Sequence, residues 1–168
     1  MIRIAITGPE SSGKTTLCRA LSEYYNVNYI PEYAREYLKN TNGKYQQSDL
    51  DQIARGQLKS INDSANSIII SDSDFSVMEI WSEYKYGRVS EVIQELATKD
   101  LFDLHILCKP DIPWEEDPLR ENPDNRDLLF NLYERSLTKH NKHFIAVSGN
   151  HTDRLEKCLH NINLLLKI

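Results

Sequence analysis

Short apolar runs alternate along the chain with longer segments whose apolar residues recur every three or four positions. The short runs are almost continuously apolar, a pattern typical of strands that are covered on both faces of a parallel sheet. We expect five strands, at residues 2–7, 27–30, 67–71, 103–108 and 144–148. The longer segments have the helical period, and we expect helices at residues 13–25, 33–39, 48–66, 75–86, 90–98, 125–139 and 152–166.

This alternation of strands and helices predicts an α/β three-layer domain with a mostly parallel sheet. At 168 residues the chain is long enough for one domain and short for two, so we expect a single domain over residues 1–168. Starts of the two longest helices are predicted at Ser48, with Asp51 after it, and at Thr152, with Glu156 after it. In such a sheet, ligands bind at the carboxyl ends of the strands.

The first predicted strand leads directly into the glycine-rich sequence GPESSGKTT, residues 8–16. This sequence fills the phosphate-loop pattern GxxxxGK(S/T) at Gly8, Gly13, Lys14 and Thr15, between a strand and a helix as the pattern requires. Backbone N–H groups of such a loop surround phosphates, Lys14 would reach the β- and γ-phosphates, and the Thr15 hydroxyl would hold Mg²⁺. The expected phosphate-binding residues are Gly8, Pro9, Glu10, Ser11, Ser12, Gly13, Lys14, Thr15 and Thr16.

Acidic residues follow the second and third predicted strands. Glu32 could orient or deprotonate an attacking hydroxyl, or it could be an acid in the first turn of a helix. Asp72 follows three isoleucines, a pattern that supplies the second Mg²⁺ contact in P-loop NTPases. Asp74 lies two residues further on, and the sequence leaves open which aspartate holds metal and which meets substrate. Arg35 is either a phosphate or substrate contact or an ion-pair partner within its helix.

An irregular stretch between the fourth strand and the sixth helix, about residues 109–126, is rich in proline and acidic residues. A long loop in a compact domain is often a lid over a site, and lid arginines neutralise charge during phosphoryl transfer. Arg120 and Arg126 are therefore candidates for contacts to the transferring group and to the nucleotide. Trp114 could stack on a substrate ring or attach the loop to the core. Of the tyrosines, Tyr33 or Tyr45 could line a pocket for an aromatic ring.

Composition limits the remaining possibilities. The net charge is −5 without any run of Lys or Arg, which argues against a nucleic-acid partner. Three scattered cysteines predict reduced thiols and no zinc site, and His140 and His143 are expected in a solvated helix end. No apolar run could cross a bilayer and no signal sequence is present, so we expect a cytoplasmic protein without a membrane partner. The oligomeric state is not predicted.

The segments GPESSGKTT, PEYAREY, SDLDQIARGQ, SDSDF and CKPDIPWEEDPLRENPDNR occur in an order and spacing that resemble the ribosylnicotinamide (nicotinamide riboside) kinase domain of NadR-type proteins. The resemblance covers roughly residues 2–160 and implies a P-loop NTPase fold. It also implies transfer of the ATP γ-phosphate to the 5′-hydroxyl of nicotinamide riboside. Acidic substrate-side positions of the family fall on Glu32, Asp72 and Asp74, and its lid arginine falls on Arg120. Some relatives carry an aromatic residue where this chain has Pro31.

The sequence therefore predicts an ATP- and Mg²⁺-dependent small-molecule kinase of nicotinamide riboside. Lys14, Glu32, Asp74 and Arg120 are the expected catalytic residues, and Thr15 and Asp72 are the expected metal ligands. Two alternatives remain: the same site could phosphorylate another nucleoside or a nucleotide, or the chain could be a non-catalytic ATP-binding regulatory module. The choice between ATP and GTP is also open.

Overall fold

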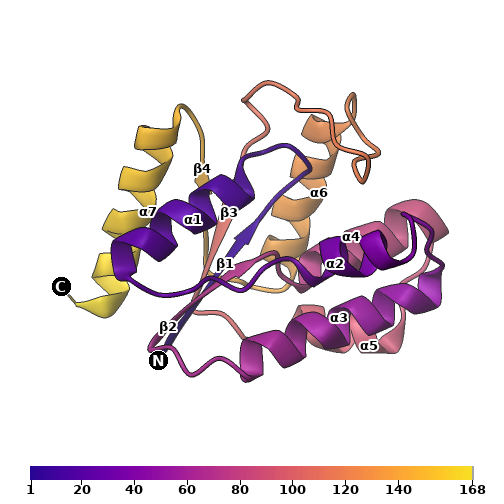
Figure 1. The fold of residues 1–168 in the computed structure, drawn as a ribbon, viewed down its shortest axis with the longest axis horizontal. Helices are drawn as coiled ribbons and strands as arrows, with labels where there is room; N and C mark the ends of the chain where they lie inside the picture. Colours follow the sequence, from indigo (N-terminus) through magenta and orange to yellow (C-terminus); the bar gives the residue numbers. More distant parts are fainter. Residues whose placement is uncertain (168) are drawn as a thin grey trace.

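In the computed structural model, which describes residues 1–167, the chain forms an α/β domain around a parallel sheet. The sheet has four strands in the order β2-β1-β3-β4, all of them parallel (Figure 1). The strands are β1 (Ile2–Thr7), β2 (Ile68–Asp72), β3 (Leu104–Cys108) and β4 (Phe144–Val147). The predicted α/β class with a parallel sheet is confirmed.

The prediction of a fifth strand is wrong. Residues 27–30 lie beside β2, but only Ile30 pairs, with Ser71, through hydrogen bonds of 2.8 Å from Ile30 N–H to Ile70 and from Asp72 N–H to Ile30. Pro31 follows directly and has no N–H to continue the ladder, and the residue before a proline is itself restricted. The segment therefore touches the edge of the sheet at one point and turns away.

Helices cover both faces of the sheet (Figure 1). The helices α1 (Lys14–Tyr25) and α7 (His151–Leu166) pack on one face, against alternate strand residues such as Ile4, Ile6 and Ile106. The other face is covered by α2 (Tyr33–Asn40), α3 (Gln47–Asn62), α4 (Phe75–Tyr86), α5 (Glu91–Thr98) and α6 (Arg126–Lys139). The intervening strand residues, among them Ala5, Ile69 and Leu107, point into this second core, as the two-residue period of a strand requires.

Both predicted starts of the long helices are shifted. Helix α3 begins at Gln47, where the Asp49 carboxylate accepts the Gln46 N–H at 2.7 Å. Helix α7 begins at His151, where Asn150 and Asp153 cap each other's backbone N–H groups. In each case a carboxylate three residues after the cap sets the start. Helix α3 also ends at Asn62, four residues before the predicted end, because Ala65 is the one apolar side chain among residues 63–66 and it is exposed.

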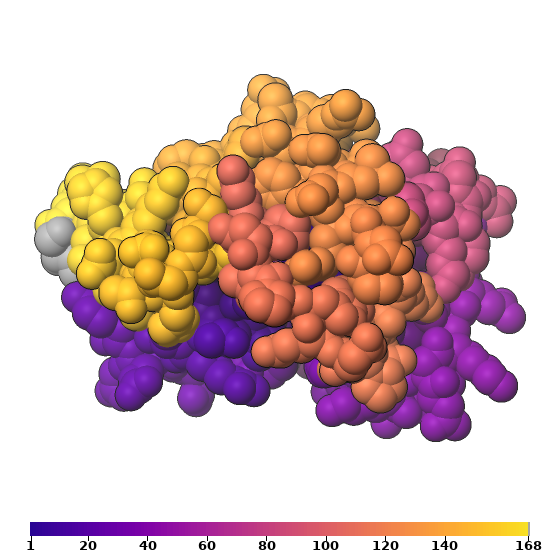
Figure 2. Space-filling view, turned by 90° about the horizontal axis from the view of Figure 1, so that it is seen from above, coloured from indigo at the N-terminus to yellow at the C-terminus, as the bar shows by residue number. Residues whose placement is uncertain are grey.

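The segment between β3 and α6, residues 109–125, has no helix or strand and lies at the carboxyl ends of the strands (Figure 1). Seen from above, it covers much of the middle of the molecule, in salmon and orange between α7 and the magenta helices (Figure 2). This is the position of the predicted lid, and we call residues 109–125 the lid segment. Within residues 1–167, no helix combines the length and the apolar character that crossing a bilayer requires.

Candidate active site

The phosphate loop connects β1 to α1 in a conformation that depends on its two glycines. Gly8 has φ +131°, and a Cβ there would lie 2.7 Å from the Cys108 carbonyl oxygen. Gly13 has φ +84° and stands immediately before α1. The first turn of α1 has no acidic residue, so its unpaired N–H groups and partial positive charge face the loop without competition. The loop is therefore built as an anion site.

Lys14 closes this loop from the inside. Its ammonium group donates to the carbonyl oxygens of Gly8 and Pro9, each at 2.8 Å. The Ser12 hydroxyl donates to the same Pro9 oxygen at 2.7 Å. These contacts hold a positive charge at the centre of the loop, where the phosphates of a nucleotide would lie.

Thr15 and Asp72, the two predicted metal ligands, lie in contact. The Thr15 hydroxyl donates to Asp72 Oδ2 at 2.6 Å. Asp72 is 3% exposed, and its second oxygen, Oδ1, is buried without a hydrogen-bond partner among residues 1–167. Burial raises the pKa of Asp72, although the Thr15 hydroxyl and the Lys14 ammonium oppose this shift. A buried carboxylate oxygen without a partner beside a hydroxyl suits a hard cation such as Mg²⁺, so the residues fit the predicted metal.

Glu32 stands at the end of α2 that faces the phosphate loop. It lines a cavity of about 140 Å³ together with Lys14, Thr15, Arg35 and Arg120. Burial raises the pKa of Glu32, and the Lys14 ammonium opposes only part of this shift. The structure therefore brings one candidate base, one phosphate-binding lysine, one candidate metal ligand and one lid arginine around a single space.

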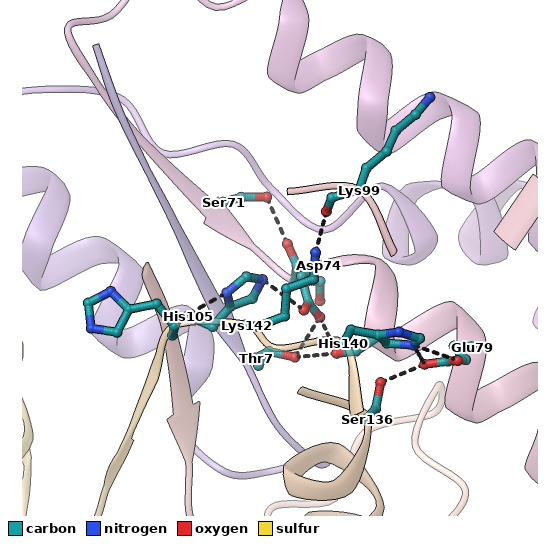
Figure 3. Close-up of polar contacts among 12 residues, drawn as sticks. Thr7, Ser71, Asp74, Glu79, Lys99, His105, Ser136, His140 and Lys142 are labelled. Carbon is teal, nitrogen blue, oxygen red and sulfur yellow. Dashed lines mark hydrogen bonds and ion pairs between the residues drawn. The ribbon is translucent and has the colours of Figure 1, made fainter. Parts of the chain in front are cut away.

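Asp74 lies outside this group. Among the described residues that line the cavity it does not appear, and Figure 3 shows its carboxylate turned toward Thr7 and His105. Its Oδ1 accepts from the Thr7 hydroxyl at 2.8 Å and from the Ser76 hydroxyl at 2.6 Å, and its Oδ2 lies 3.5 Å from His105 Nε2. Burial lowers the pKa of His105, although Asp74 opposes this shift. The two aspartates that the sequence could not separate thus face different surroundings.

His140 is not solvated, contrary to the prediction. Its Nε2 lies 3.0 Å from an oxygen of Glu79, a carboxylate that is itself 5% exposed, and the Ser136 hydroxyl bonds to the same carboxylate (Figure 3). Burial raises the pKa of Glu79, but the Ser136 and His140 bonds outweigh it, so the pKa lies below its usual value. This cluster links α4 to α6. The sequence pattern did not predict this cluster, because Glu79 lies within a helix and its partners are far away in the sequence.

The lid segment is attached to the phosphate loop through Arg120 and through Arg126, the first residue of α6. Arg126 Nη1 donates to the carbonyl oxygens of Ser11 and Ile112, each at 3.0 Å. Arg120 Nη1 donates to the Ser11 hydroxyl at 3.4 Å and to the Glu115 carbonyl oxygen. The two guanidinium groups lie 5.8 Å and 5.7 Å from the centre of the Trp114 ring. Trp114 thus packs against the lid arginines, which favours the interpretation that it fixes the lid.

A second cavity, of about 310 Å³, opens beside the first. The two share Glu10, Leu38, Trp81 and Leu119. Tyr45 and Trp81 stack on its wall with ring centres 5.9 Å apart, and Lys85 Nζ lies 3.9 Å from the centre of the Tyr45 ring. Burial lowers the pKa of Lys85, but Tyr45 and Glu121 outweigh burial and raise it, so Lys85 holds a positive charge at this wall. Tyr45 was a predicted pocket residue; Trp81 was missed because it reads as part of a helix.

Two further arginines shape the site. Arg154, on α7, is 5% exposed and donates to the carbonyl oxygens of Ser12, Lys109 and Gly149, at 2.8, 3.0 and 2.9 Å. It therefore joins the phosphate loop to the loops that follow β3 and β4. No sequence motif predicted this role of Arg154. Arg35 forms an ion pair with Asp117 and so connects α2 to the lid segment. Tyr133, also missed, lines the first cavity from α6.

The comparison with protein families agrees with this geometry. The model of the AAA domain family matches residues 3–154. The chain belongs to the AAA domain family. This AAA domain is 32% identical, over 166 residues, to the trifunctional NAD biosynthesis/regulator protein NadR of Salmonella typhimurium (strain LT2) and to that of Escherichia coli (strain K12). Each alignment covers 93% of the chain and 40% of the relative, so the chain spans about two fifths of the curated relatives it matches.

Solved structures place the AAA domain in the same fold. It superposes with a TM-score of 0.80 and 18% identity on a crystal structure of NadR protein in complex with NR, covering 99% of this chain and 52% of that one. A deoxyadenosine kinase from M. mycoides with bound products gives a TM-score of 0.66 at 18% identity, covering 97% and 100%. These likenesses show a P-loop kinase-like fold. The resemblance to NadR-type proteins that the motifs predicted is confirmed.

Proposed function

We propose that this AAA domain is an ATP- and Mg²⁺-dependent kinase that phosphorylates the 5′-hydroxyl of nicotinamide riboside to give nicotinamide mononucleotide. The observation that carries the proposal is the contact between Thr15 and Asp72, which leaves one buried carboxylate oxygen for a cation beside the phosphate loop. The similarity to NadR proteins, one of them solved in complex with NR, supports the choice of acceptor.

The phosphate loop would bind the ATP phosphates through its backbone N–H groups and through Lys14, which would turn from the Gly8 and Pro9 oxygens to the β- and γ-phosphates. Thr15 and Asp72 would hold Mg²⁺, which would neutralise charge on the phosphates. Arg120 would contact the transferring group from the lid, while Arg126 keeps the lid on the loop. Most of the rate enhancement would come from positioning and electrostatics.

Glu32 is the proposed general base because it shares the cavity with Lys14 and Arg120. Its raised pKa brings the carboxylate closer to the range in which it can accept a proton from a hydroxyl near neutral pH. Asp74, whose oxygens are taken by Thr7, Ser76 and His105, would support the site from behind without touching the acceptor.

The second cavity fits an acceptor with a positively charged aromatic ring. Its wall carries the stacked Tyr45 and Trp81 rings. Lys85 lies over the Tyr45 ring and pairs with Glu121, and Glu10 adds a second carboxylate, so acidic residues outnumber basic ones along the cavity. Aromatic faces and carboxylates attract a pyridinium. An acceptor that already bears a phosphate would need more basic residues than the cavity offers, which places a nucleoside ahead of a nucleotide. Because the fold also occurs in a deoxyadenosine kinase and in a thymidylate kinase, another nucleoside or a nucleotide is the main alternative.

The test is steady-state ADP release in ATP and Mg²⁺, with and without a panel of nucleosides. Nicotinamide riboside heads the panel, and its reduced dihydro form, which has a similar shape but no ring charge, is the matched control. We expect strong stimulation by nicotinamide riboside and little by the dihydro form. Stimulation by a neutral nucleoside alone would redirect the assignment to that acceptor. Hydrolysis that no nucleoside stimulates would favour a nucleotide acceptor or an ATP-binding regulatory module.

A further inference from the structure

The phosphate loop contains a carboxylate, Glu10, at one of its variable positions. A negative charge beside the polyphosphate of ATP repels it and costs binding energy. The contacts of Glu10 therefore need an explanation that phosphate binding does not supply.

The Glu10 carboxylate faces the lid segment. Its oxygens accept the backbone N–H of Glu121 at 3.1 and 3.2 Å and the backbone N–H of Asn122 at 2.9 Å. Bonds from N–H groups to an ionised carboxylate are shorter and stronger than neutral ones. The next residue, Ser11, continues the same contact: its hydroxyl accepts the Glu115 N–H at 2.9 Å, and its carbonyl oxygen accepts from Arg126. Two neighbouring residues of the phosphate loop thus attach both ends of lid residues 115–122.

Arg120 lies between these two attachment points. It lines the cavity with Lys14 and Glu32, and its guanidinium reaches the Ser11 hydroxyl. Lid residues 109–125 form no helix or strand, so contacts with other segments determine where Arg120 points. The Arg35–Asp117 and Lys85–Glu121 ion pairs hold side chains on either side of it, and Glu10 binds the lid backbone directly after it. Loss of the Glu10 bonds at residues 121–122 would leave the carboxyl-terminal side of Arg120 held through the Glu121 side chain, by long contacts of 3.4 Å to Lys85 and to Tyr45.

We propose that Glu10 is a positioning residue: it holds the lid segment on the phosphate loop so that Arg120 faces the transferring phosphoryl group. The proposal rests on the proposed function for its kinetic part. It explains why a carboxylate occupies the loop, and it predicts a separation of effects. Removing the carboxylate lowers kcat through Arg120, while ATP binding stays the same or becomes tighter because a repelling charge is gone.

Four variants test the proposal: Glu10→Ala, Glu10→Gln, Arg120→Ala and the double variant Glu10→Ala/Arg120→Ala. Because a misplacement of about 1 Å can cost about 100-fold in rate, we expect Glu10→Ala to lower kcat by roughly 10- to 100-fold. Glu10→Gln keeps one acceptor oxygen and should fall between Ala and the unaltered protein. In the Arg120→Ala background, adding Glu10→Ala should cost less than about 3-fold, because residues that act through one another are not additive.

A readout without substrate separates this proposal from the proposed function. Trypsin should cleave after Arg120 several times faster in Glu10→Ala than in the unaltered protein. The reason is that the cleavage rate follows the fraction of molecules in which the lid segment is locally open, so a roughly 10-fold larger open fraction gives about 10-fold faster cleavage. Glu116→Gln, which alters an exposed lid carboxylate, is the matched control and should change neither trypsin cleavage nor kcat. Thermal unfolding confirms that each variant is folded.

The positioning role would be overturned if Glu10→Ala lowered kcat equally in the unaltered protein and in Arg120→Ala. It would also be overturned if Glu10→Ala left trypsin cleavage unchanged. Weaker ATP binding in Glu10→Ala would overturn it as well, because the carboxylate would then serve the nucleotide site directly. If the unaltered protein phosphorylates no nucleoside, the proposed function fails, and trypsin cleavage alone still decides whether Glu10 holds the lid.

Discussion

Asp72 and Asp74 lie two residues apart after the same strand and are almost equally buried, at 3% and 4% exposed, yet their surroundings differ. Asp72 bonds to Thr15 with one oxygen and leaves the other without a partner among residues 1–167. Asp74 receives two hydroxyl bonds and lies beside His105. One carboxylate is incomplete and faces the phosphate loop; the other is satisfied and faces the interior.

We infer from this difference that Asp72 is available to bind a cation and that Asp74 supports the surrounding structure. A buried carboxylate without full hydrogen bonding is costly, and folding tolerates it where a cation or substrate completes it. A fully bonded carboxylate stabilises its neighbours, here Thr7 at the end of β1 and Ser76 at the start of α4. Glu32 and Glu79 differ in the same way: Glu32 lines the cavity, whereas the Glu79 carboxylate bonds to Ser136 and His140.

Among the carboxylate variants, the largest expected effect is that of Asp72→Asn on catalysis. An amide of the same size keeps the bond to Thr15 but coordinates a cation poorly, so kcat should fall by about 10²- to 10³-fold. The melting temperature should stay the same or rise. Burial of the Asp72 charge costs free energy, which is why it raises the pKa, and the neutral amide avoids this cost. Steady-state kinetics over a range of Mg²⁺ concentrations and thermal unfolding measure both. An Asp72→Asn protein that is active but unstable would show that Asp72, like Asp74, has a structural role.

Asp74→Asn should show the reverse. Loss of the charged acceptor for Thr7, Ser76 and His105 should cost about 2–3 kcal/mol of unfolding free energy, which lowers the melting temperature by roughly 5–10 °C in a chain of this size. Well below that temperature, kcat should stay within about 3-fold, since the side chain touches no reacting group. Differential scanning calorimetry with kinetics at 20 °C checks this. A large loss of kcat in a stable variant would return Asp74 to the active site.

The smallest expected effect concerns Glu32→Gln and stability. Because burial raises the Glu32 pKa in the folded chain, ionisation costs folding free energy as pH rises from the unfolded pKa, near 4.5, through the folded pKa. Glu32→Gln should therefore melt a few degrees higher at pH 7, since about 1 kcal/mol corresponds to about 2–4 °C. The two proteins should converge at low pH, where Glu32 is protonated. A melting temperature lowered at pH 7 would contradict the costly-carboxylate account.

Local patterns predicted much of this molecule. The phosphate loop, the Asp72 position and the lid between β3 and α6 follow from short motifs and from where strands end, because a parallel sheet brings its carboxyl ends together. The four strands found were also predicted, within a residue or two at each end. Residues 27–30 were predicted as a strand because three of the four are apolar or aromatic. In the structure only Ile30 pairs with β2, and Pro31 after it has no N–H to continue the pairing.

What the sequence hid depends on contacts between distant segments. Arg154 lies 142 positions from Ser12, the loop residue whose carbonyl oxygen it binds. Trp81 lines a cavity together with the lid residues Pro118 and Leu119, and His140 is half-buried against Glu79. The distinction between Asp72 and Asp74 is of the same kind, because both strand-end carboxylates fit the motif and only their partners in space differ.

The most direct test of the account follows the γ-phosphate of labelled ATP with nicotinamide riboside present, in the unaltered protein and in Lys14→Ala. The account predicts labelled nicotinamide mononucleotide from the unaltered protein. Lys14→Ala should be folded yet form the product at least about 10³-fold more slowly, because it removes the charge that stabilises the transferring phosphate. Label that appears as free phosphate regardless of the nucleoside, or equal product from Lys14→Ala, would contradict the account.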